Sequence, residues 1–175
     1  MTRAGFVSLI GPPNAGKSTL MNTLVGTKVS IVTPKVQTTR SRVRGIAMHD
    51  DAQVIFIDTP GIFTPKRRLD RAMVSAAWQG ASDGDLVVLV HDAARSQIDD
   101  DTLRILDQLN TNNVRAALVL NKIDLMDREK LLERASALSS RAEFSQVFML
   151  SAEKASGTDD FLKCCLLYTS DAADE

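Results

Sequence analysis

One stretch of this sequence constrains the fold more than any other, because a glycine-rich run lies between a strand-like and a helix-like segment. The run is Gly11-Pro12-Pro13-Asn14-Ala15-Gly16-Lys17-Ser18, with apolar residues 4–10 before it and the helix-like residues 19–25 after it. Glycines at both ends let the backbone curl until successive N–H groups point inward, and the following helix adds the positive end of its dipole. The run therefore predicts a loop that wraps phosphates.

Two side chains at the end of this run carry the charge chemistry. Lys17 would reach the β- and γ-phosphates of a nucleoside triphosphate. Ser18 offers a hydroxyl to Mg²⁺, an ion that keeps several waters and takes only a few protein ligands. The alternative is a simple glycine turn before a helix.

The rest of the chain alternates between short apolar runs and helical patterns. Runs typical of strands covered on both faces are residues 6–10, 54–57, 86–90, 116–120 and 147–150. Apolar residues recur at helical spacing between them, at Leu69, Ala72, Met73, Ala76 and Ala77 and again at Leu131, Leu132, Ala135 and Leu138. Asp99-Asp100-Asp101 places negative charge where a helix start favours it, ahead of Leu103, Leu106 and Leu109. Thr158 is expected to cap a helix that carries Phe161 and Leu162. We predict an α/β fold, a doubly wound and mainly parallel sheet of about six strands flanked by helices.

Composition is compatible with one domain, which we assign to residues 1–164. The 175 residues are 44% hydrophobic and 25% charged, and the net charge of −1 argues against whole-surface attraction to nucleic acid. No apolar run is long enough to span a bilayer, and residues 1–5 lack the pattern of a secretory signal, so a cytoplasmic location is expected. The adjacent Cys164 and Cys165 indicate neither a disulfide framework nor a zinc site.

Two later motifs predict recognition of guanine. Asn121-Lys122-Ile123-Asp124 follows an apolar run, and a carboxylate can accept from the two adjacent N–H donors on guanine's edge, which adenine does not offer. A buried acceptor left unpaired by the wrong base costs roughly 1–3 kcal/mol, so such a site discriminates strongly. Ser151-Ala152-Glu153 closes the last run and is expected to offer a backbone N–H to the base oxygen.

Two further segments predict a switch that senses the γ-phosphate. In Asp58-Thr59-Pro60-Gly61 the aspartate can hold Mg²⁺ through water and the glycine N–H can meet the γ-phosphate. Residues 27–44 are polar and have no clear period, as expected of a mobile loop, and a threonine of Thr38-Thr39-Arg40 would complete the Mg²⁺ shell. The alternative for this loop is an ordinary connector with surface threonines.

The order of these motifs resembles the GTPase domain of the Era-type GTPases, which act in bacterial small-ribosomal-subunit assembly. The most specific stretch is Val29-Ser30-Ile31-Val32-Thr33-Pro34-Lys35-Val36-Gln37-Thr38-Thr39-Arg40-Ser41-Arg42, which resembles the first switch of that family. The resemblance covers about residues 3–163 and implies GTP-binding and GTP-hydrolysing activity, with GTP or GDP and Mg²⁺ bound.

The resemblance also implies a role for each motif residue. Gly11 to Thr19 would bind phosphates, and Mg²⁺ would be held by Ser18, by Thr39, which directly precedes the arginine, and through water by Asp58. The segment at the γ-phosphate would comprise Thr59, Pro60, Gly61 and Ile62. Guanine would be bound by Asn121, Lys122, Asp124, Ser151 and Ala152. The residues expected to act in hydrolysis are Lys17, Thr39, Gly61 and Asn14, the last as a candidate potassium ligand.

Ile62 and Asn14 bear on how fast such a domain works. Ras-like enzymes carry a water-orienting glutamine at the position of Ile62, whose side chain cannot hydrogen-bond to water, so slow intrinsic hydrolysis is expected. The amide oxygen of Asn14 could bind K⁺ beside the phosphates. The alternative is that Asn14 suits a tight turn, because asparagine tolerates left-handed backbone.

Partners follow only from the resemblance. Era-type proteins carry an RNA-binding KH domain after the GTPase domain, and this chain ends before one could begin, so binding to 16S rRNA and the small subunit is implied for a full-length protein and not expected of this chain alone. Peripheral association with the inner membrane is a further family property. Residues 165–175 read like a translated sequencing-adapter tail and are expected to be non-native, the alternative being a natural final helix supported by Leu166 and Leu167.

Three rival functions stay open. The first is a guanine-nucleotide sensor with negligible turnover. The second is a Der-type or tRNA-modifying GTPase, which shares the phosphate and guanine motifs. The third is an ATP-using kinase with the same phosphate loop, which the guanine motif disfavours.

Overall fold

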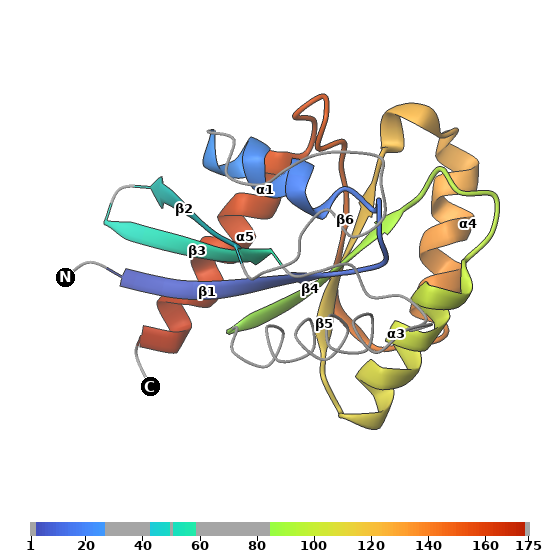
Figure 1. The fold of residues 1–175 in the computed structure, drawn as a ribbon, viewed down its shortest axis with the longest axis horizontal. Helices are drawn as coiled ribbons and strands as arrows, with labels where there is room; N and C mark the ends of the chain where they lie inside the picture. The colour runs from blue at the N-terminus through green and yellow to red at the C-terminus, as the bar shows by residue number, and fades with distance from the viewer. Residues whose placement is uncertain (1–2, 27–42, 50, 59–84, 174–175) are drawn as a thin grey trace.

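A six-stranded sheet organises the chain (Figure 1). The computed structural model describes residues 3–26, 43–49, 51–58 and 85–173. The strands are β1 (Arg3–Ile10), β2 (Val43–His49), β3 (Ala52–Asp58), β4 (Leu86–Asp92), β5 (Ala116–Asn121) and β6 (Phe144–Met149). Their order is β2-β3-β1-β4-β5-β6, with β2 antiparallel to β3 and the other neighbours parallel. The predicted fold class is confirmed.

Helices cover both faces of this sheet. They are α1 (Lys17–Val25), α3 (Asp100–Thr111), α4 (Arg128–Ser139) and α5 (Thr158–Ala173), with a short 3₁₀ turn, η1 (Ile123–Leu125). Figure 1 shows α1 beside α5 on one side of the sheet and α3 with α4 on the other. Along β4, Val88 and Val90 join the core under α1 and α5, whereas Leu89 joins the core under α3 and α4. This alternation explains why a central strand reads as a continuous apolar run.

The two edge strands are where the apolar runs mislead. The sequence analysis did not predict β2, because this strand exposes Ile46 and Met48 while burying Gly45 and Ala47. Such alternation leaves no continuous apolar run. β6 was expected to be covered on both faces, but Val147 is 40% exposed because β6 lies at the end of the sheet. The expectation for β6 was therefore wrong in burial although right in position.

Among the described residues a helix lies at each expected position, and one residue of the stripe on α4 differs from the expectation. Asp99 caps α3 by accepting a hydrogen bond from the backbone N–H of Thr102 at 2.7 Å, and α5 begins at Thr158. Leu131 and Leu138 pack in the core as expected, but Leu132 is 53% exposed, because four apolar residues on α4 cover a wider arc than the sheet contacts. The expected stripe at 69–77 lies outside the described residues.

Helix α5 extends into the segment expected to be non-native. Cys165 is fully buried in the core between α5 and the sheet, and Leu166 and Tyr168 pack against the same core. Both cysteines are free thiols. The natural or non-native origin of residues 165–175 stays a prediction, and the helical packing of its first residues is what the alternative, a final helix, requires.

The topology brings several loops to one edge of the sheet. β1 lies between β3 and β4, and the connections from β1 to these two neighbours run in opposite directions along the sheet. The loop after β1 therefore starts in the crevice where ligands of such sheets bind. Because β1, β3, β4, β5 and β6 are parallel, their carboxyl ends share this edge. Residues 11–16, 93–99, 122–127 and 150–157, which follow four of these strands, are therefore neighbours.

Candidate nucleotide-binding site

The glycine-rich loop takes a shape that only glycine allows at its two ends. A Cβ atom on Gly11 would lie 2.4 Å from the backbone carbonyl oxygen of Val90 in β4. Gly16 has φ 98°, and a Cβ atom there would lie 2.1 Å from the Nδ2 of Asn121. Asn14, between them, has φ 64°, which is the left-handed backbone that the turn interpretation of this residue requires. Its role as a potassium ligand stays a prediction.

The start of α1 is prepared for an anion. Its N-cap is Gly16, which has no side chain to cap the helix, and its first turn carries no acidic residue. The other described α-helices have Asp100, Glu129 or Asp159 in their first turns. The positive end of the α1 dipole is therefore not met by a carboxylate of its own first turn, which fits a phosphate bound there.

Lys17 lies across this loop. The side chain is 6% exposed, and its Nζ donates to the carbonyl oxygens of Gly11 and Pro12, each at 3.1 Å. These contacts place an ammonium group among the residues that would surround phosphates, and a phosphate oxygen would offer it a stronger, charge-assisted bond. Ser18 and Thr19 follow on the first turn of α1, both half-buried.

Asn121 joins three loops with one amide group. Its Nδ2 donates to the carbonyl oxygen of Ala15 at 3.0 Å, and its Oδ1 accepts from the backbone N–H groups of Lys122 at 2.8 Å and Ala152 at 3.0 Å. The residue is 2% exposed. It therefore holds the phosphate loop against both segments that were predicted to bind guanine, and a buried network of this kind fixes their relative position.

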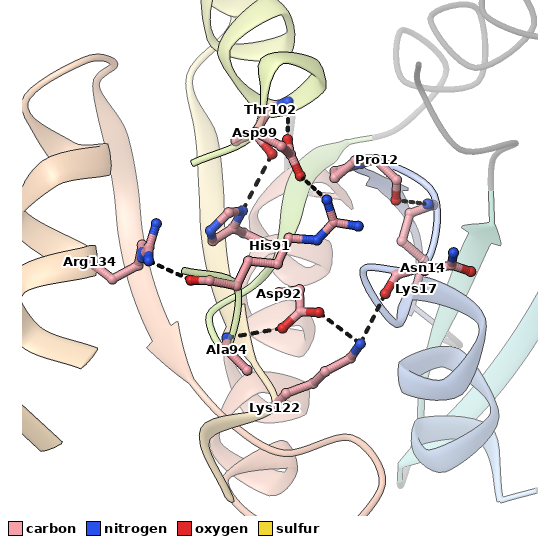
Figure 2. A network of polar contacts seen from close by, with 11 residues as sticks. Pro12, Asn14, Lys17, His91, Asp92, Ala94, Asp99, Thr102, Lys122 and Arg134 are labelled. Carbon is pink, nitrogen blue, oxygen red and sulfur yellow. Dashed lines mark hydrogen bonds and ion pairs between the residues drawn. The ribbon is translucent and has the colours of Figure 1, made fainter. Parts of the chain in front are cut away.

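Lys122 adds a second link between the same loops. Its Nζ donates to the carbonyl oxygen of Asn14 at 3.1 Å and forms an ion pair with the Oδ2 of Asp92 at 2.9 Å (Figure 2). Asp92 ends β4, and its Oδ1 accepts from the backbone N–H of Ala94 at 3.0 Å. Lys122 thus runs from the guanine motif to the phosphate loop rather than outward into solvent.

The remaining guanine residues differ in how they are held. Asp124 is exposed on η1, where a carboxylate is accessible to a base. The N–H of Ser151 donates to Ser156 O at 2.9 Å and that of Ala152 to Asn121, so a base oxygen would compete with acceptors already inside the protein. The expectation that this segment offers an N–H to the base stays a prediction. The hydroxyl of Thr23 in α1 donates to the carbonyl of Ala152 at 2.8 Å and fixes the segment.

Several predicted residues cannot be placed. Thr39, Thr59, Pro60, Gly61 and Ile62 lie outside the described residues. Asp58 is the last residue of β3, with its backbone paired in register to Leu9 and Val43. Within the described ranges no three His, Cys, Asp or Glu side chains gather where they could hold a metal. The Mg²⁺ assignments to Ser18, Thr39 and Asp58 stay predictions.

Comparison with known proteins agrees with this geometry. The family model described as "50S ribosome-binding GTPase" matches residues 6–122, which include the phosphate loop and the start of the guanine motif. This chain belongs to that GTPase family. The matched segment also contains Lys122 and its two side-chain partners, Asn14 and Asp92.

Within the family, proteins named GTPase Era are close relatives. GTPase Era of Bradyrhizobium diazoefficiens is 55% identical over 159 residues, which are 91% of this chain and 51% of that protein. A crystal structure of Era in complex with MgGDPNP and nucleotides 1506–1542 of 16S ribosomal RNA has TM-score 0.87 and 34% identity over 96% of this chain and 57% of that one. Era of Aquifex aeolicus bound to GDP and AlF4⁻, a point variant, has TM-score 0.85 and 36% identity over 95% and 57%. The resemblance to Era is confirmed, and the chain spans about half the length of the curated relatives it matches.

Two contact residues escaped the sequence analysis of this GTPase domain. Asp92 was missed because the apolar run ends at Val90, although a carboxylate at the carboxyl end of a buried parallel strand lies at the ligand edge. Thr23 carries no such signal, since a threonine inside a helix is commonplace and its contact with Ala152 depends on the packing of α1 beside the loop after β6.

His91, next to Asp92, is buried, and we expect it to make the free energy of unfolding sensitive to acid. Its Nδ1 lies 3.4 Å from the hydroxyl of Thr102 (Figure 2). Its Nε2 has no hydrogen-bond partner within the part of the chain that the structure describes. Burial lowers the pKa of His91 to about 4, an effect that Asp99 and Asp92 oppose and Arg134 and Arg95 assist. Between pH 6.5 and 4 the unfolded chain binds a proton that the folded chain does not, so the free energy of unfolding should fall by about 3 kcal/mol as the pH drops through this window.

The His91→Gln variant tests this prediction. Glutamine keeps a hydrogen-bonding group near Thr102 but does not titrate, so its unfolding free energy should depend less on pH between 6.5 and 4 than that of the wild type. Urea denaturation at several pH values measures both slopes. Parallel curves for the two proteins would contradict the assignment to His91.

Proposed function

We propose that this chain is the guanine-nucleotide-binding domain of an Era-type GTPase, which binds GTP with Mg²⁺, hydrolyses it to GDP and phosphate, and switches between the two states. The observation that carries the proposal is the side chain of Asn121, which bonds the phosphate loop at Ala15 and the two guanine segments at Lys122 and Ala152. One site thus combines a cradle for phosphates with an acid for the base.

The donor set fits a triphosphate that carries a metal ion. Lys17 supplies an ammonium group, the first turn of α1 supplies N–H groups, and Ser18 supplies a hydroxyl of the kind Mg²⁺ binds. Mg²⁺, when bound, would neutralise charge that develops on the phosphate oxygens. Thr39 and Asp58 are the proposed further ligands, and Gly61 the proposed γ-phosphate contact. The Era structure with MgGDPNP and the Era structure with GDP and AlF4⁻ support this choice of nucleotide and metal.

Slow hydrolysis is the expected behaviour of the isolated chain. Because Ile62 replaces a water-orienting glutamine, we expect intrinsic turnover on the order of 10⁻⁴ to 10⁻² s⁻¹. Single-turnover hydrolysis of GTP measures it, with ATP as competitor. Turnover far above this range, or equal competition by ATP, would contradict the proposal. No turnover even with ribosomal subunits would favour a guanine-nucleotide sensor.

A separate experiment tests Asn14. Equal rates of hydrolysis in KCl and NaCl at one ionic strength would favour the turn role of Asn14 over potassium binding.

The proposed setting is small-subunit assembly. An Era structure that contains nucleotides 1506–1542 of 16S rRNA supports a partnership of the full-length protein with the small subunit. A cytoplasmic location, with peripheral membrane association of the full-length protein, is part of the same proposal. Among the described residues, no helix combines the length and apolar character needed to cross a bilayer.

A further inference from the structure

We infer that Asp92 is a positioning residue for nucleotide binding, which acts by holding Lys122 against the phosphate loop. The inference rests on the proposed function and adds a residue outside the motifs that predicted it. The observation behind it is the path from Asp92 through the Nζ of Lys122 to the carbonyl oxygen of Asn14, with contacts of 2.9 and 3.1 Å (Figure 2).

Asp92 is itself fixed before it meets the lysine. It is the last residue of β4, its side chain is nearly buried, and its Oδ1 accepts from the N–H of Ala94 at 3.0 Å. Only Oδ2 then faces Lys122, so the direction of the ion pair is set by the sheet and not by the flexible lysine. A rigid carboxylate of this kind removes much of the ordering cost that weakens pairs between two mobile side chains.

Lys122 needs such a partner because of where its backbone lies. It has φ 65° just after β5, and its stem has to cross from there to Asn14 in the loop after β1. A carbonyl oxygen is a neutral acceptor, whereas the carboxylate of Asp92 supplies the charge that holds the ammonium in the crevice. Without Asp92, the lysine would be free to turn toward solvent, and the phosphate loop would lose its link to the guanine motif through Lys122.

Asparagine at position 92 separates the ion pair from the turn. In Asp92 two donors face different carboxylate oxygens, Ala94 N–H at Oδ1 and Lys122 Nζ at Oδ2. Asparagine has one oxygen, so with that oxygen on Ala94 its NH₂ group faces the ammonium of Lys122, donor against donor. We expect Asp92→Asn to weaken GDP binding about tenfold, mainly through faster release. Asp92→Ser should do the same, because its hydroxyl can still accept from Ala94 but cannot reach Lys122.

The matched control is Asp127→Asn. Asp127 makes the same chemical type of pair, with Lys130 at 3.9 Å, but both side chains are exposed and the pair stands at the start of α4. This variant should release GDP at the wild-type rate. Thermal unfolding of each variant with and without GDP separates folding from binding, since a positioning role lowers the GDP-induced rise in Tm rather than the Tm of the nucleotide-free protein.

The decisive measurement repeats Asp92→Asn in a Lys122→Met background. If Asp92 acts through Lys122, then Asp92→Asn should change the dissociation constant for GDP very little once Lys122 has been replaced by methionine. Equal tenfold effects in both backgrounds, or wild-type GDP release by Asp92→Asn, would overturn the inference alone. Failure of the wild-type chain to prefer GDP over ADP would instead overturn the proposed function, and the inference with it.

Discussion

Replacing Gly16 with alanine should disable nucleotide binding and destabilise the fold in one step. The new methyl group would stand 2.1 Å from the Nδ2 of Asn121, and φ 98° disfavours any residue with a Cβ. Asn121 cannot yield cheaply, because its amide is buried and bonded to three loops. We expect a loss of about 2–4 kcal/mol in the free energy of unfolding and at least a roughly 100-fold rise in the dissociation constant for GDP.

Gly26 provides the matched control for this variant. It ends α1 at φ 81°, also in the left-handed region, but a Cβ atom there would meet nothing within 4 Å. Gly26→Ala should cost only about 1 kcal/mol of stability from backbone strain, and GDP affinity should not change. Urea denaturation and calorimetric titration with GDP measure both quantities. Similar losses for the two alanine variants would show that contact with Asn121 is unimportant.

Substitution of Asp124 by asparagine should exchange guanine for xanthine. The carboxylate can accept from two adjacent N–H donors of guanine, whereas an amide can donate to the oxygen that xanthine carries instead of the amino group. The turn around Asp124 is held by backbone bonds, from Leu125 N to Lys122 O and from Met126 N to Ile123 O, both 3.1 Å, so the substitution leaves its shape intact. We expect GTP affinity to fall about 100-fold or more and xanthosine triphosphate affinity to rise.

Competition between the two nucleotides measures this exchange. Asp127→Asn, three residues along the chain and outside the guanine motif, should keep the wild-type preference. Unchanged GTP affinity in the Asp124 variant would mean that the acid does not contact the base, and the assignment of this motif would be wrong.

Local sequence predicted the central elements of the fold because their burial is nearly uniform. β4 and β5 are covered by helices on both faces, so continuous apolar runs marked them correctly. At the edges the same signal failed, since β2 alternates between buried and exposed residues and β6 is only partly covered. Leu132 was misplaced for a related reason: helical periodicity shows which residues share a side of α4 but not how far the sheet extends under it.

In the candidate site, too, some features were predicted from the sequence and others appeared only in the structure. The roles proposed for Gly11, Gly16, Lys17 and Asp124 were predicted from chain order, because motif spacing and elementary chemistry suffice to propose them. The roles of Asn121 and Lys122 in joining loops were not, since their partners Ala15 and Asn14 lie more than a hundred positions away, at 106 and 108 residues. Asp92 and Thr23 belong to none of the predicted motifs, although Asp92 lies at the carboxyl end of a buried strand.

The sequence alone determined which groups are present and in which order: a glycine-rich loop predicted to bind phosphates, an acid predicted to select the base, and alternating strands and helices that indicate a mainly parallel sheet. Only the tertiary structure decided which of those groups touch. The physical reason is that parallel strands bring their carboxyl ends to one edge whatever their separation along the chain, so contacts such as Asn121 with Ala15 and Lys122 with Asp92 depend on strand order, which is β3-β1-β4-β5 around this crevice.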